Sequence, residues 1–143
     1  MRYMWYGIAW VLVLSIFVSP AFARTPVLEP ELPEGYTSWM KVVERACELA
    51  PDKKLATTFW AAPADPQMVL LLMSLNGKRF LQTNMVLVGG VPIGAHNHLF
   101  TKEKGWLLYD LSKPEEDDWA IEDMLKELGV SKEEYKKKCG NAS

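Results

Sequence analysis

Apolar residues recur at helical spacing near the start of the chain. Between residues 37 and 50, Trp39, Val43 and Ala46 follow one another at intervals of four and three, and charged residues fill the positions between them. This spacing predicts a helix with one apolar stripe. Pro51 ends it, because proline cannot continue a helix.

Residues 55–111 alternate between β-prone runs and turn signals. Asn76-Gly77 separates two apolar runs, while Gly89-Gly90 and the segment 102–105 separate the runs that follow. Asn-Gly is a strong hairpin signal because both residues tolerate positive φ. Short turns between successive β-prone segments predict an antiparallel meander of about five strands.

The run at residues 66–76 leaves an alternative open. Asp65-Pro66 can cap a helix and Gly77 can end one, whereas a single hairpin turn explains both flanking segments and favours a strand. Residues 68–73 show no polar alternation, so such a strand must be covered on both faces. A curled sheet, the proline-rich segment before the domain, a second subunit or a ligand would each provide the second cover.

Two helices are predicted at the C-terminal end. Ser112–Glu115 forms a capping box before an apolar stripe that ends at Leu128, and Gly129 stops that helix. Ser131–Glu134 forms a second capping box before a last short helix.

Two cysteines, Cys47 and Cys139, complete the predicted architecture. An even count in an exported chain favours a disulfide. It would close a loop of about 90 residues, for which chain entropy gives about 4–5 kcal/mol. The predicted fold class is therefore α+β: an N-terminal helix, an antiparallel meander of about five strands, and two C-terminal helices packed on one face, with a disulfide between the first and last helix.

The chain divides into three predicted segments. Arg2, an apolar run and the small-residue site Ala21-Phe22-Ala23 predict a signal peptide over residues 1–23. Residues 24–36 form a proline-rich extended leader, and residues 37–140 form a single domain. We therefore expect an exported protein, periplasmic or secreted, with no stable membrane span after cleavage.

Charge restricts the class of partner. The chain has 16 basic and 18 acidic residues, a net charge of −2 and no basic stripe. Nucleic-acid binding depends on neutralising phosphates with Lys and Arg, so this composition argues against it. An unknown protein or a small ligand remains as partner, and the apolar strand would also allow a dimer.

The candidate polar site comprises His96, His98 and Asp110. The two histidines are two residues apart and would share one face of a strand, with Asp110 on the paired strand. Neutral imidazole binds zinc or copper, so these three residues are candidate metal ligands. No other cofactor is expected.

The order of cysteine, histidine and aspartate offers a second interpretation. The residues from His96 to Ser112, with Gly105-Trp106 and Tyr109-Asp110, resemble the transglutaminase-like cysteine hydrolases. This resemblance implies Cys47 as nucleophile, His98 as general base and Asp110 as its orienting partner. In that family the nucleophile opens a central helix, whereas Cys47 lies near the end of the predicted one.

Aromatic residues suggest a binding surface. Trp60, Phe80, Trp106 and Tyr109 fall on neighbouring predicted strands, where an aromatic sheet face would hold a ligand. The first functional hypothesis is therefore a small non-enzymatic exported binding or accessory domain. The alternative is a metal site or a degenerate hydrolase-like enzyme that uses His96 or His98 with Asp110.

Overall fold

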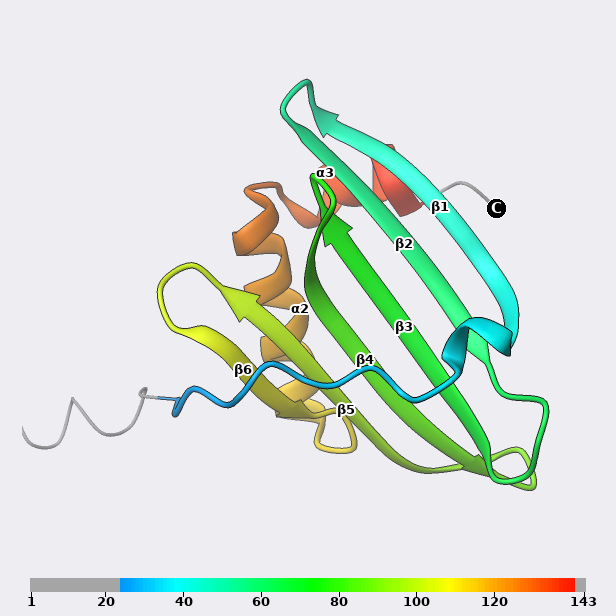
Figure 1. Cartoon of the computed structure of the whole chain (residues 1–143). Coiled ribbons are helices and arrows are strands. Elements are labelled where there is room, and N and C mark those ends of the chain that lie inside the picture. Colours follow the sequence, from blue (N-terminus) through cyan, green and yellow to red (C-terminus); the bar gives the residue numbers. More distant parts are fainter. Residues whose placement is uncertain (1–23, 141–143) are drawn as a thin grey trace, which may run out of the picture.

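The structure, a computed structural model, describes residues 24–140 (Figure 1). Within them one antiparallel sheet has six strands in the order β1-β2-β3-β4-β5-β6. The strands are β1 (Met40–Ala50), β2 (Lys53–Ala61), β3 (Gln67–Leu75), β4 (Lys78–Val88), β5 (Val91–Thr101) and β6 (Gly105–Asp110). A short 3-10 helix, η2 (Tyr36–Ser38), precedes them, and the helices α2 (Pro114–Leu128), α3 (Lys132–Tyr135) and η3 (Lys136–Gly140) follow.

The α+β class, the antiparallel meander and the C-terminal helices are thus confirmed. The predicted signal peptide, residues 1–23, lies outside the described residues. Among the described residues, no helix has the length and apolar character needed to cross a membrane.

The helix predicted for residues 37–50 is wrong, because this segment forms η2 and then strand β1. Strand β1 lies at the edge of the sheet and pairs only with β2. Most of its side chains are exposed and only Leu49 is fully buried, so its sequence does not show the alternation of a half-buried strand. Its pairing with β2 therefore outweighs the helical spacing of its apolar residues. As a result the sheet has six strands rather than about five.

The main core lies between the sheet and the helices. In Figure 1, α2 lies behind β5 and β6, while α3 and η3 lie behind the β1–β2 end of the sheet. Met73, Leu81, Leu99 and Leu107 sit opposite one another on successive strands and face these helices. With Leu128 of α2 they form one buried cluster.

Strand β3 confirms the strand interpretation of residues 66–76 and is covered on both faces. Leu70 points away from the helices and is fully buried, yet it does not belong to the helix-side cluster. The predicted leader ends one residue earlier than expected, because Tyr36 begins η2; from here on the leader is residues 24–35, which cross this opposite face from β6 towards β1 (Figure 1). We call this surface the leader face. The second cover is therefore the proline-rich leader.

A disulfide joins Cys47 to Cys139 and confirms the predicted pairing. It links β1 to η3 rather than two helices. Lys138 beside it donates from Nζ to the carbonyl oxygen of Leu49 at 2.7 Å. The edge strand and the end of the chain are thus held together, as is expected in an oxidising compartment.

Replacing both cysteines, as C47S/C139S, should lower the free energy of unfolding by about 4 kcal/mol, because the bond spans 92 residues. Urea denaturation of the variant and of the oxidised wild-type protein measures this difference. Reduced wild-type protein should match the variant. A difference below about 1 kcal/mol would show that η3 holds β1 without the bond.

Candidate functional site

His96, His98 and Asp110 lie together on the leader face. His96 of β5 is directly opposite Asp110 of β6 and Asn84 of β4, and His98 is two residues along the same strand. The predicted placement on one face is therefore observed. Within residues 24–140, however, no three His, Cys, Asp or Glu side chains are grouped closely enough to hold a metal ion.

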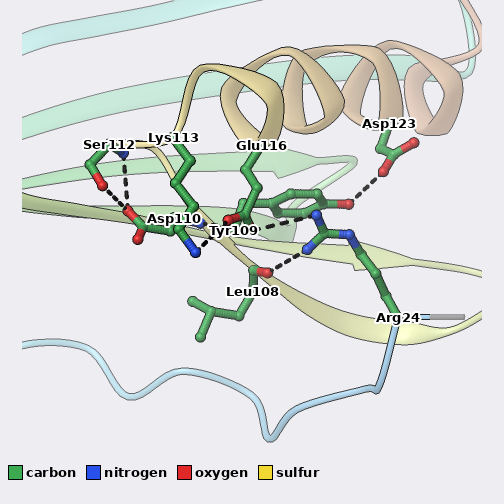
Figure 2. A network of polar contacts seen from close by, with 8 residues as sticks. All are labelled: Arg24, Leu108, Tyr109, Asp110, Ser112, Lys113, Glu116 and Asp123. Carbon is green, nitrogen blue, oxygen red and sulfur yellow. Dashed lines mark hydrogen bonds and ion pairs between the residues drawn. The ribbon is translucent and has the colours of Figure 1, made fainter. Parts of the chain in front are cut away.

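Asp110 is engaged by Ser112 rather than by a histidine. The Ser112 hydroxyl and backbone N–H donate to Asp110 Oδ1 at 2.6 and 3.0 Å (Figure 2). These hydrogen bonds hold the pKa of the Asp110 carboxyl below its usual range. Ser112 therefore does not form the predicted capping box: the N-cap of α2 is Lys113, whose side chain makes no capping hydrogen bond within the described part of the chain. Of the second box, the N-cap half is observed: Ser131 accepts from the Glu134 N–H, whereas the Glu134 carboxylate pairs with Lys138 at 3.0 Å.

Cys47 lies apart from these residues. Strands β2, β3 and β4 separate its strand from the one that carries His98. Its sulfur is bonded to Cys139, so it offers no thiolate. The structure does not bring together the three residues that the hydrolase resemblance implies.

The four predicted ligand-binding aromatic residues do not form one surface. Phe80 and Tyr109 belong to the buried helix-side cluster. Trp60 lies on the leader face, where it contacts Tyr36 edge to face at 5.4 Å between ring centroids. Trp106 lies on the same face at the other side of the sheet.

The leader face is organised around Arg79 of β4. Its guanidinium donates to Gln82 Oε1 at 2.7 Å, to Glu29 Oε1 at 2.9 Å and to the carbonyl oxygen of Pro30 at 3.0 Å. The same group lies 5.7 Å from the centre of the Trp106 ring. One side chain thus recognises both a carboxylate and the main chain of the leader.

Gln82, three residues after Arg79 on β4, also binds the leader. Its Nε2 donates to the carbonyl oxygen of Glu31 at 2.9 Å and to Asn84 Oδ1 at 3.0 Å. Only 1% of Gln82 is exposed, although its side chain is polar. Burial follows from the leader, which closes over it.

Arg24 anchors the start of the leader at the edge of β6 (Figure 2). It donates to the carbonyl oxygen of Leu108 at 2.9 Å and pairs with Glu116 of α2 at 3.5 Å. Its guanidinium lies 4.3 Å from the ring centre of Tyr109 and 5.0 Å from that of Trp119. Two rings, a carboxylate and a carbonyl therefore surround the cation.

Tyr109 supports this anchor from the core. Its hydroxyl donates to Asp123 of α2 at 2.5 Å, and its side chain is fully buried. Burial, followed by the bond to Asp123, raises the pKa of Tyr109 above its ordinary value. The hydroxyl therefore stays protonated and acts as a fixed donor.

His98 lies where the leader passes from Trp106 to Gln82. It is directly opposite Gln82, and its Nδ1 atom is buried and has no hydrogen-bond partner among residues 24–140. Burial lowers the pKa of His98, and the nearby His96 and Arg79 lower it further. The folded protein therefore favours neutral His98.

Sequence reasoning missed Arg79 and the role of the leader carbonyls. Arg79 follows the Asn76-Gly77 turn beside Lys78, in a strand that also has polar residues at positions 82–84, so no local signal distinguished it. No protein-family model, curated protein or solved structure matches this chain.

His98 should make the protein less stable in mild acid. The unfolded chain binds a proton near the ordinary pKa of 6.5 and the folded protein binds it only at lower pH, so stability falls as pH drops below about 6.5. In His98→Gln, the free energy of unfolding should fall less between pH 6.5 and pH 5 than it does in the wild type, as measured by urea denaturation at each pH. His96→Gln, which changes an exposed residue on the same strand, should keep most of this fall, because burial is the largest cause of the lowered pKa of His98 and His96 is only the second. An unchanged pH profile in His98→Gln would contradict the prediction.

Proposed function

We propose that this protein is a small non-enzymatic exported binding module whose leader face holds an extended, acidic segment of a protein partner. The observation that carries the proposal is that an extended acidic segment, the leader, already lies on this face. Its contacts with Arg79 and Gln82 give the chemistry of the expected ligand.

Most of these contacts do not depend on the leader's side chains. Arg79 and Gln82 donate to the carbonyl oxygens of Pro30 and Glu31, which any peptide offers. The leader's side-chain contribution is the Glu29 carboxylate, which forms an ion pair with Arg79. No donor is required from the peptide at these positions, so proline is accepted. The preferred ligand is an extended peptide with an acidic residue next to a proline.

The leader is held weakly enough to be exchanged. Leu28 is 90% exposed, and the Glu29 side chain of the main ion pair is 62% exposed. Exposed ion pairs contribute about 0–1 kcal/mol because water and salt screen them. Because the leader belongs to the same chain, its effective concentration at this face is on the order of millimolar, and this favours it over a free segment. A partner segment with a better fit therefore displaces it.

The test uses the purified full chain and a synthetic peptide with the sequence of residues 28–34, titrated by calorimetry. Glu29→Gln weakens the attached leader, so the free peptide should bind this variant about two to five times more tightly than it binds the wild type. With the leader already weakened by Glu29→Gln, adding Arg79→Gln should make the peptide bind at least about fivefold more weakly than it binds Glu29→Gln alone, because the second change removes the donor to a carboxylate and a carbonyl.

Arg45→Gln, a change at an exposed arginine on β1, is the matched control and should bind as the wild type does. A peptide with Lys in place of both central glutamates should not bind. The proposal fails if no variant binds the acidic peptide at millimolar concentration, or if adding Arg79→Gln to Glu29→Gln leaves the affinity for the peptide unchanged.

A further inference from the structure

Strands β4 and β5 separate at one end of the sheet. Strand β4 begins at Lys78, but its pairing with β5 begins only at the Leu81–Leu99 pair. Strand β5 continues to Thr101, paired there only with β6. In Figure 1 the β3–β4 hairpin and the β5–β6 hairpin diverge at this end, and α2 lies behind the opening.

The opening is a crevice of about 410 Å³. This volume lies within the range of small-molecule sites. Residues of both hairpins and one residue of α2 line it: Leu75, Asn76, Lys78, Arg79, Phe80, Phe100, Lys102 and Glu127.

The crevice combines an apolar wall with a cationic rim. Leu75, Phe80 and Phe100 supply the wall, and Phe100 contacts Trp106 edge to face at 5.6 Å between ring centroids. The Lys78 ammonium lies 5.5 Å from the centre of the Phe100 ring, so positive charge lies directly beside the aromatic surface.

Charge in the crevice has the opposite sign to that of the whole chain. Arg79 is already paired with Glu29, which leaves the two cations Lys78 and Lys102 against one lining acid, Glu127, whereas the chain has a net charge of −2. Glu127 accepts from the Lys102 backbone N–H at 3.3 Å, so its carboxylate is directed at the turn between β5 and β6. The excess of cations over acids favours an anionic ligand.

We propose that this crevice binds a small amphipathic organic anion, with a flat apolar body against Phe100 and a carboxylate or sulfonate between Lys78 and Lys102. This site is separate from the peptide surface of the proposed function and shares only Arg79 with it. The tests leave Arg79 unchanged, so that failure of one proposal is distinguishable from failure of the other.

Three probes separate charge from apolar contact, each titrated into the full chain and followed by NMR chemical shifts. Naphthalene-2-sulfonate should bind with a dissociation constant of about a millimolar or tighter, as its size allows. Neutral naphthalene-2-methanol should bind at least about fivefold more weakly, because it lacks the charge. Methanesulfonate, which lacks the apolar body, should bind at least about tenfold more weakly.

The double variant K78Q/K102Q tests the rim and should bind naphthalene-2-sulfonate at least about fivefold more weakly than the wild type. Both lysines are exposed, so the fold should be kept. K136Q/K137Q, which removes two exposed lysines of η3, is the control and should bind normally.

The shifts caused by the sulfonate should map to residues 75–80 and 100–102. The proposal is overturned if the neutral probe binds equally well, if K78Q/K102Q binds unchanged, or if methanesulfonate binds as tightly as the aromatic anion. Shifts centred on Gln82 and the leader would also overturn it and assign the anion to the leader face.

Discussion

Strand β3 has apolar side chains on both faces, and both layers around the sheet follow from this. Met73 faces the helices, while Leu70, three residues earlier, faces the leader and is fully buried. Burying a leucine side chain is worth about 1.5–3 kcal/mol, so neither face is left to water without loss of stability. Helices cover one face because they are amphipathic and are held by the disulfide. The leader covers the other.

The two covers differ in kind. On the helix side, a continuous apolar cluster excludes water. On the leader side, the contacts are polar and come from a few side chains: Arg24 at one end, then Arg79 and Gln82. A segment that replaces the leader must therefore supply carbonyls and a carboxylate, and it must also cover Leu70. An extended segment that contains proline meets both needs, because the proline ring is apolar and leaves the neighbouring carbonyls available.

The sequence predicted those parts of the fold that depend on local signals. The Asn76-Gly77 turn is at the predicted position with positive φ at both residues, and Gly129 ends α2 as expected. Strand β1 was missed because an exposed edge strand buries almost none of its side chains, so its apolar positions do not follow the period of two that marks a half-buried strand. The cysteine count was enough to predict the disulfide. The elements that it joins, β1 and η3, were not predicted correctly, because the segment that forms β1 was predicted to be a helix.

The candidate site was less predictable, because it depends on contacts between distant segments. His96 and Asp110 were placed correctly, since strand alternation and a single hairpin determine their shared face. The role of Arg79 was not accessible, because its partners Glu29 and Pro30 lie about 50 residues earlier. Nothing local indicates that residues 24–35 return across β4. Arg79 also lines the crevice between β4 and β5. The guanidinium that holds Glu29 therefore also borders the crevice, and the two surfaces meet at this one side chain.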